Sequence, residues 1–171
     1  GGSASVPGAF QFISPGFIAN AGVNSVGMSF TPEDADNYLV ATGSISVLVN
    51  KVSPAVSILP TPSAITYGQS LQQSVLSGGS ASVDGVFSFV SPSSVPNAGM
   101  AAAGVVFTPI DLGNYLSASG SVLVQVNKAM PSITGLPVAS PIIYGQPLSA
   151  STLSAGAGSV AGGFAFSAPA F

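Results

Sequence analysis

Apolar and small polar residues alternate along several short stretches of the chain. Ile45, Val47 and Val49 occupy every second position of one stretch, and the same alternation recurs over 121–126. A period of two carried by β-branched residues is typical of a strand with one buried face. The pattern therefore predicts a strand over 44–49 and another over its recurrence, each with its Val and Ile side chains turned inward.

Similar alternation, or a short apolar run bounded by Gly and Pro, predicts further strands elsewhere. They are expected at 10–12, 26–30, 56–58, 65–67, 71–76, 87–89, 103–107, 115–119 and 164–166. Three of these stretches carry two Phe residues at strand spacing, and we expect these rings in the core. No stretch shows the spacing of an amphipathic helix.

The chain repeats itself at a fixed distance. A Val-x-Gly-x-Phe-x-Phe motif begins at Val6, Val83 and Val160, so that each step is 77 residues. The decapeptide FTPEDADNYL at 30–39 returns as FTPIDLGNYL at 107–116, at the same step. A constant period without insertions indicates tandem copies of one structural unit.

Each unit most naturally ends after an Asn-Lys pair, because a Pro follows shortly at Pro54 and Pro131. Residues 52–128 then form one complete repeat. Residues 1–51 correspond to the C-terminal part of a preceding repeat, and 129–171 to the N-terminal part of the next. We expect the segment to belong to a longer array of such repeats.

About seven short strands fall within each 77-residue repeat, separated by turns of hairpin length. Parallel strands need a crossover of a dozen or more residues, for which this spacing leaves no room. The pattern therefore predicts an all-β fold, with each repeat an antiparallel β-sandwich.

The composition argues against several classes of function. Charged residues make up only 4% of the chain, where soluble domains average roughly 25%. Two lysines and a net charge of −3 cannot supply the basic stripe of a nucleic-acid binder. Cys and His are absent, which excludes thiolate and imidazole chemistry. We expect no enzyme, no catalytic residue, no cofactor, no resident metal and, for want of a long apolar run, no membrane span.

An acidic loop is the one candidate cation site. Glu33, Asp34 and Asp36 offer the oxygen atoms that Ca²⁺ prefers. The second repeat keeps only Asp111 and Asn114 in the corresponding loop. A site that disappears in the next copy favours a loop-capping role for the Asp, with calcium as the alternative.

The two lysines, Lys51 and Lys128, occupy the same position in successive repeats, at the end of each unit. A solvated Lys near the junction is the favoured interpretation. A Lys–Asn isopeptide cross-link is the alternative, although it requires a buried Lys and a nearby carboxylate.

The repeated loop also carries a resemblance to a known family. Asp34 stands four residues before Tyr38, and Asp111 four before Tyr115. This spacing resembles the tyrosine corner of immunoglobulin-like domains, in which the Tyr hydroxyl bonds to the backbone and fixes the loop. The resemblance implies that these four residues are a structural corner.

The wider repeat is similar to the bacterial immunoglobulin-like domains found in tandem in large surface and secreted proteins. The motifs that carry the similarity are ITYGQSL (65–71), VDGVFSF (83–89), NAG (97–99), FTPIDLGNY (107–115) and VLVQVNKAMP (122–131). The resemblance implies tandem immunoglobulin-like β-sandwiches, an extracellular or cell-surface location, and a role as a fibre, shaft or stalk.

Outward apolar positions and scarce charge together suggest self-association. Leu48, Met100, Val106 and Leu123 are expected to face outward and are candidate assembly contacts. Few charges guard the strand edges against pairing with other chains. We expect a structural protein whose partner is the same protein, assembled into an extracellular fibre, filament or sheath. The alternative is the stalk of a surface adhesin whose binding head lies elsewhere.

Strand exchange between chains is a variant of this expectation. Residues 129–171 carry the early strands that 1–51 lack. The two pieces overlap, however, because 1–17 and 155–171 are the same part of the repeat. Simple strand donation would therefore duplicate a strand.

Overall fold

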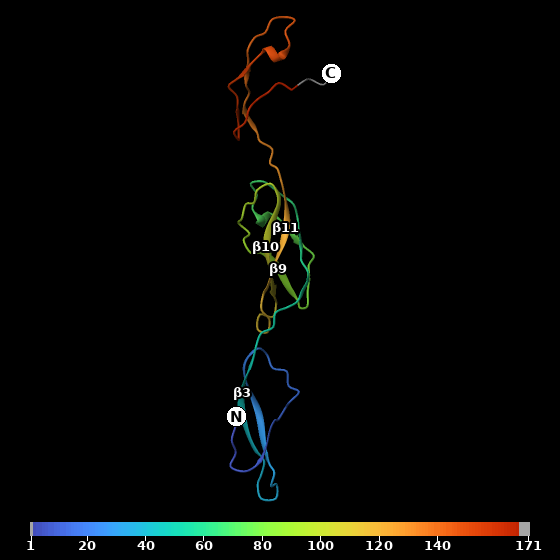
Figure 1. Ribbon diagram of the computed structural model, residues 1–171, viewed down its shortest axis with the longest axis vertical. Helices are drawn as coiled ribbons and strands as arrows, with labels where there is room; N and C mark the ends of the chain where they lie inside the picture. Colours follow the sequence, from blue (N-terminus) through green and yellow to red (C-terminus); the bar gives the residue numbers. More distant parts are fainter. Residues whose placement is uncertain (1, 168–171) are drawn as a thin grey trace. The chain divides into compact units, whose positions relative to one another are not determined.

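The computed structural model describes residues 2–167, and it is nearly all β, as the sequence pattern predicts (Figure 1). The chain divides into two compact units, Gly1–Val126 and Asn127–Phe171. The first unit holds the first repeat and nearly all of the complete second repeat. The last four residues of the third expected domain, 168–171, lie outside the described residues.

The first repeat forms a three-stranded antiparallel sheet in the order β1-β2-β3. Its strands are β1 (Gly8–Phe12), β2 (Gly22–Pro32) and β3 (Ala41–Val49). Phe10 lies opposite Phe30, with 4.9 Å between the ring centroids. β2 ends at Pro32 because proline has no amide hydrogen to continue the ladder.

The second repeat contains one four-stranded antiparallel sheet, in the order β6-β11-β10-β9, and two small two-stranded ladders, β4-β8 and β5-β7. The strands are β4 (Val56–Ile58), β5 (Thr61–Pro62), β6 (Ile65–Thr66), β7 (Leu76–Ser77), β8 (Ser80–Ala81), β9 (Gly85–Phe89), β10 (Gly99–Pro109) and β11 (Ala118–Asn127). A single 3₁₀ turn, η1 (Leu71–Gln73), lies between β6 and β7. Five of these eight strands have only two or three residues.

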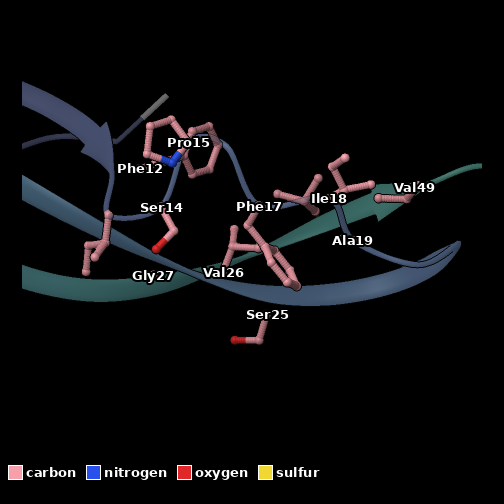
Figure 2. A pocket seen from close by; sticks show the side chains of 12 residues that line it. Phe12, Ser14, Pro15, Phe17, Ile18, Ala19, Ser25, Val26, Gly27 and Val49 are labelled. Atoms are coloured by element: carbon pink, nitrogen blue, oxygen red, sulfur yellow. The ribbon is translucent and has the colours of Figure 1, made fainter.

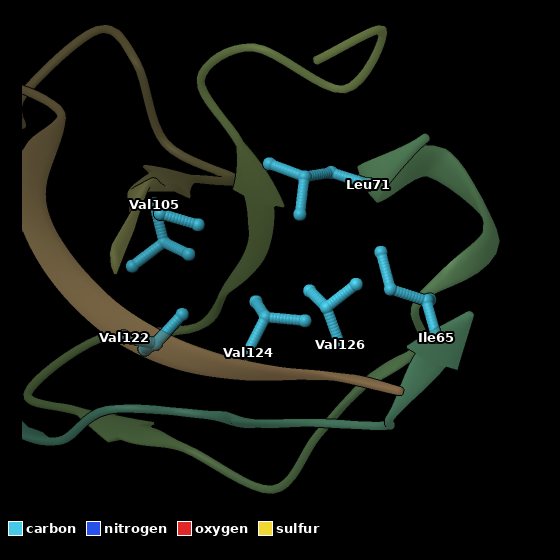
Figure 3. Packing of buried hydrophobic residues seen from close by; sticks show 7 residues of the cluster. Ile65, Leu71, Val105, Val122, Val124 and Val126 are labelled. Atoms are coloured by element: carbon cyan, nitrogen blue, oxygen red, sulfur yellow. The ribbon is translucent and has the colours of Figure 1, made fainter. Parts of the chain in front are cut away.

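The core of the second repeat forms where β10 and β11 face the segment from β6 to η1. Val105, Val124 and Val126 are fully buried, and Ile65 and Leu71 cover them (Figure 3). The expected alternation of β11 is confirmed, since its Val side chains point inward while the residues between them are exposed. Burial of each such side chain contributes roughly 1.5–3 kcal/mol, so this cluster is the main source of stability of the repeat.

The prediction of a strand over 71–76 is wrong. The side-chain oxygen of Gln73 accepts a 3.0 Å hydrogen bond from the backbone N–H of Ser70, which closes a turn. The amides of Leu71 and Gln72 donate to the carbonyl oxygens of Ser94 and Pro92, at 2.9 and 2.7 Å. The segment therefore forms a 3₁₀ turn, and its backbone amides donate hydrogen bonds to a loop instead of to a strand.

The third repeat consists of short paired pieces. They are β12 (Ile133–Gly135), β13 (Val138–Ala139), β14 (Leu153–Ser154), β15 (Ala157–Gly158) and the 3₁₀ turn η2 (Leu148–Ala150). β12 pairs with β15 and β13 with β14. The expected strand at 164–166 is not formed. Its counterpart β9 pairs with β10, and the described residues of the third repeat include no counterpart of β10.

Two further expectations need correction. The stretch 115–119 becomes a strand only at Ala118, because the loop before it continues as a turn to Asn114. The paired Phe residues of the first repeat are not core residues. Phe10 is 46% exposed and Phe12 50%, and the described residues of the first repeat include no counterpart of β6 and η1.

Candidate functional site at the junction between repeats

The loop that follows β2 and β10 is built in the same way in both repeats. In the second repeat the carboxylate of Asp111 accepts two hydrogen bonds from Asn114, one from the backbone N–H at 3.1 Å and one from the side-chain amide at 2.8 Å. Asp34 and Asn37 make the same two bonds, at 3.2 and 2.8 Å. The expected capping of local amides by the Asp is therefore seen in both copies.

The Asp, and not the Tyr hydroxyl, makes the hydrogen bonds that hold this loop. The backbone N–H of Tyr115 donates to the carbonyl oxygen of Asp111 at 3.1 Å, and that of Tyr38 to Asp34 at 3.2 Å. Among the hydrogen bonds of the described residues, neither Tyr hydroxyl donates to the backbone. The resemblance to a tyrosine corner thus extends to the spacing but not to its hydroxyl bond.

Asn114 also reaches across the junction to the first repeat. Its side-chain oxygen accepts a 2.7 Å hydrogen bond from the backbone N–H of Ala21, and its amide nitrogen lies 3.3 Å from the side-chain oxygen of Asn20. Asp111 holds the amide so that its oxygen is free for Ala21. The loop of the second repeat therefore binds the Asn-Ala-Gly turn that precedes β2 of the first.

Backbone hydrogen bonds within the second repeat place its first residue, Val52, beside the same loop. The carbonyl oxygen of Asn114 accepts from the N–H of Val52 at 3.1 Å, and the carbonyl oxygen of Val52 accepts from the N–H of Leu116 at 3.0 Å. Val52 and Tyr115 form an isolated parallel bridge. Lys51 donates from Nζ to the carbonyl oxygen of Leu112 at 2.6 Å, so it is exposed but bonded across the junction. We name Asn20, Ala21, Lys51, Val52, Asp111, Leu112, Asn114 and Leu116 together the junction.

Hydrogen bonding at the junction lowers the pKa of the Asp111 carboxyl group. The hydrogen bonds from Asn114, first from its side chain and then from its backbone, lower the pKa of Asp111 below its usual 3.8, and Lys51 acts in the same direction. These donors favour the ionised carboxylate. Ionised Asp111 is therefore the form that orients Asn114.

Sequence reasoning found the corner residues but not the junction. The structure brings Asp111 and Tyr115 to the junction, while Asp34 and Tyr38 form the same loop on the first repeat. The signal was present in the sequence, because both the Asn of the loop and the Asn-Ala-Gly turn recur at the period of 77. Nothing in the pattern showed that they meet between neighbouring repeats.

The candidate assembly contacts lie mostly where they were expected. Leu48, Met100 and Leu123 are exposed, whereas Val106 is only half-exposed. In the register of β10 with β11, Ala102 lies opposite Leu123, and Met100 stands two residues away on the same outward face. The outer face of this sheet is therefore apolar around these two side chains.

In the acidic loop of the first repeat, the carboxylate of Asp34 accepts hydrogen bonds from within the loop. The two oxygens of Asp34 accept from Asn37. Within residues 2–167, no three acidic, His or Cys side chains gather as a metal site would require. The described part of the chain also has no helix with the length and apolar character needed to cross a bilayer.

Comparison with protein-family models, with curated proteins and with solved structures found no match to this chain.

Proposed function

We propose that this chain is a structural protein whose tandem immunoglobulin-like repeats assemble with other copies of the same protein into an extracellular fibre, filament or sheath. The extracellular location and the kinship with bacterial tandem repeats are supported by the motif resemblance. Self-assembly is supported by the distribution of charge in the folded chain.

One observation carries the proposal. All seven charged side chains, two Lys and five acidic, lie outside the strands. Natural sheets commonly protect their edges and exposed faces with charged side chains. Here the strands instead expose apolar side chains, among them Val23 and Leu48, which lie directly opposite one another on β2 and β3. Little electrostatic repulsion opposes association of such surfaces.

The test replaces apolar side chains on the outer faces. Leu48→Lys and Leu123→Lys each place a cation on an exposed strand position, and the purified chain is followed by sedimentation velocity and negative-stain electron microscopy. We expect ordered multi-chain assemblies for the unaltered chain and their loss in the double variant. Leu39→Lys is the matched control, because Leu39 is exposed but lies outside the strands. An unaltered chain that stays monomeric at high concentration contradicts the proposal.

The junction favours a second candidate, the stalk of a surface adhesin. Hydrogen bonds that involve the side chains of Asn114 and Lys51 join the first two repeats, with no Gly/Ser linker between them. Such contacts limit bending between neighbours and suit a spacer that holds a binding head away from a surface. A monomeric chain whose junction bonds persist in solution is the outcome that selects this candidate.

A further inference from the structure

The four-stranded sheet of the second repeat ends at β9, which has a neighbour, β10, on one side only (Figure 1). All residues of this repeat, 52–128, belong to the described part of the chain, so the free side of β9 is a property of the complete repeat. The free side of an edge strand is a template for pairing with another chain unless something protects it.

The other strands that end a sheet or ladder in this repeat carry such protection. β6, β7 and β8 have two residues each, β5 contains Pro62, and the register of β4 shifts between Val56 and Ile58. Short strands, prolines and bulges are the usual means of blunting an edge. β9, by contrast, has five residues in continuous register with β10 and contains neither a charged residue nor a proline.

The hydrogen bonds at the two ends of β9 show which of its residues bond to β10. The carbonyl oxygen of Asp84 accepts from the N–H of Ile110 at 3.0 Å, and the N–H of Val90 donates to the carbonyl oxygen of Gly104 at 2.9 Å. In an antiparallel ladder every second residue bonds to a given neighbour. The even-numbered residues of β9 therefore bond to β10.

The odd-numbered residues, Gly85, Phe87 and Phe89, consequently turn their backbone N–H and C=O toward the free side. Among the hydrogen bonds of the described residues, none brings a partner to these groups from another part of the chain. Evenly spaced donors and acceptors along a strand are matched best by a second strand.

The segment that follows β9 leaves this edge open. The carbonyl oxygens of Pro92 and Ser94 accept hydrogen bonds from η1 at 2.7 and 2.9 Å. The counterpart of this segment in the first repeat, 13–19, lies over β2 and β3, with Phe17 beside Val26 (Figure 2). In both repeats the chain thus leaves the edge strand across the sheet and not along its free side.

We propose that β9 of one chain pairs with β9 of a second copy, antiparallel about a two-fold axis at Phe87. The edge is self-complementary for this pairing, because Phe87, with its outward N–H and C=O, is the middle residue of the strand. Phe87 then lies opposite Phe87 of the second copy, and Gly85 opposite Phe89, so that about six backbone hydrogen bonds join the two sheets. The same surface is used on both copies, so the contact is isologous.

Side chains and charges fit this register. The half-buried ring of Phe89 faces Gly85 of the second copy, and an aromatic ring opposite an edge glycine stabilises strand pairing. Asp84 is the only charged residue of 80–90, and it lies opposite Val90 of the second copy. No two like charges therefore meet, and a second copy is the partner that this edge fits.

The inference rests on the proposed self-assembly and deepens it, because it names a strand through which two copies join. Edge pairing and the outer-face contacts involve different surfaces. Leu48→Lys with Leu123→Lys changes the outer faces and leaves β9 as it is. This double variant is therefore the background in which the edge can be tested without large assemblies.

Amide hydrogen exchange, read by nuclear magnetic resonance on the whole chain in this background, tests the pairing directly. In dilute solution the Phe87 amide should exchange quickly, because nothing in its own chain bonds to it. In concentrated solution we expect it to exchange at least about tenfold more slowly. The amides of Val86 and Ser88, which already bond to β10, should change little.

Pairs of charges test the register. Val86 and Ser88 are both exposed, and the two-fold places each opposite the other residue of the second copy. Val86→Lys with Ser88→Lys opposes like charges, so protection of the Phe87 amide should need about tenfold more protein. Val86→Lys with Ser88→Glu opposes unlike charges and should keep the protection.

Val86→Glu with Ser88→Glu is the control for net charge and should behave like the Lys pair. Slow exchange of the amides at positions 86 and 88 shows in each variant that β9 remains in its sheet.

Three outcomes overturn the inference. The Phe87 amide exchanges equally fast at both concentrations, or it is already protected in the dilute chain, or the like-charge and unlike-charge variants behave alike. If the unaltered chain assembles while its Phe87 amide stays unprotected, edge pairing fails and the proposed self-assembly stands. If the Phe87 amide is protected but no ordered assembly forms, edge pairing stands and the proposed fibre fails.

Discussion

The side-chain oxygen of Asn114 accepts a hydrogen bond from the backbone N–H of Ala21 over 2.7 Å, although 93 residues separate the two in the chain. The bond joins the loop of one repeat to the turn before β2 of its predecessor. Because both partners recur with the period of the array, the same bond can form at every junction where a complete loop follows a complete turn. When the same bond forms at each junction, the sequence of the single repeat determines how neighbouring repeats are arranged.

Asn114→Ala should release the Ala21 amide without unfolding either repeat. A typical hydrogen bond contributes a net 0.5–1.5 kcal/mol, so we expect the Ala21 amide to exchange with solvent about 2- to 10-fold faster. Amide hydrogen exchange followed by nuclear magnetic resonance measures this directly.

Asn37→Ala is the matched control for that experiment. It removes the same two bonds to an Asp within the corresponding loop of the first repeat, but no contact to Ala21. Ala21 should therefore keep its protection in this variant. Equal exchange rates in Asn114→Ala and the unaltered chain would mean that the junction bond is not formed in solution.

The sequence predicted the burial of β11 correctly because it follows from the alternation of that strand, whereas the predicted inward position of Ile45 on β3 is wrong, since Ile45 is 42% exposed. Val122, Val124 and Val126 are buried on one side of β11, as their spacing indicates. The segment after β6 was mispredicted because its apolar residues, Leu71 and Leu76, also suit a strand. The turn depends on the side chain of Gln73, a short-range polar contact that an apolar pattern does not record.

The candidate site was only partly predictable for a different reason. Asp111 and Asn114 signal a capped loop through their spacing alone, since their bonds are local. Their second role depends on Ala21, which belongs to the neighbouring repeat. The period shows that the Asp-Asn loop and the Asn-Ala-Gly turn recur together. It does not show that the loop of one repeat binds the turn of the repeat before it.

Acid should weaken the junction through Asp111. Its pKa is lowered in the folded chain, so the unfolded chain binds the proton more readily between that lowered value and about 3.8. The stabilising contribution is therefore complete above the unfolded value and is lost as pH falls through the folded one. We expect Asp111→Asn to reduce the loss of thermal stability between pH about 6 and about 2.5, measured by circular dichroism.

The control for the acid experiment is Asp84→Asn, which removes one carboxylate away from the junction. Its acid sensitivity should match that of the unaltered chain. If Asp111→Asn loses as much stability in acid as the unaltered chain does, the Asp111 carboxylate has no stabilising role. A carboxyl titration by nuclear magnetic resonance then shows whether its pKa is lowered at all.

Equivalent core positions should differ in their contribution to stability. Val124 is fully buried in the second repeat, and its counterpart Val47 is only half-buried on β3. We expect Val124→Ala to cost about 2 kcal/mol, from two lost methyl groups and the cavity they leave. Val47→Ala should cost about half of that or less in dilute, monomeric chain, because its methyl groups already contact solvent.

Urea unfolding followed by tyrosine fluorescence measures both variants, since the chain contains four Tyr and no Trp. Equal costs would indicate that Val47 is as well covered in solution as Val124.

Glycine at position 85 is required by the close approach of two strands. A Cβ there would overlap the ring of Phe107 and the carbonyl oxygen of Thr108 on β10, and Gly8 meets Phe30 and Thr31 in the same way. Gly85→Ala must therefore displace β9 or tilt the Phe107 ring, whose centroid lies 5.0 Å from that of Phe87. We expect Gly85→Ala to lower the free energy of unfolding by about 1–3 kcal/mol, typical of overpacking, measured by urea unfolding.

Gly43→Ala is the control, because a Cβ at Gly43 meets nothing within 4 Å, and it should leave stability nearly unchanged. A neutral Gly85→Ala would show that the Phe107 ring moves aside freely, and that this glycine recurs for a reason other than packing.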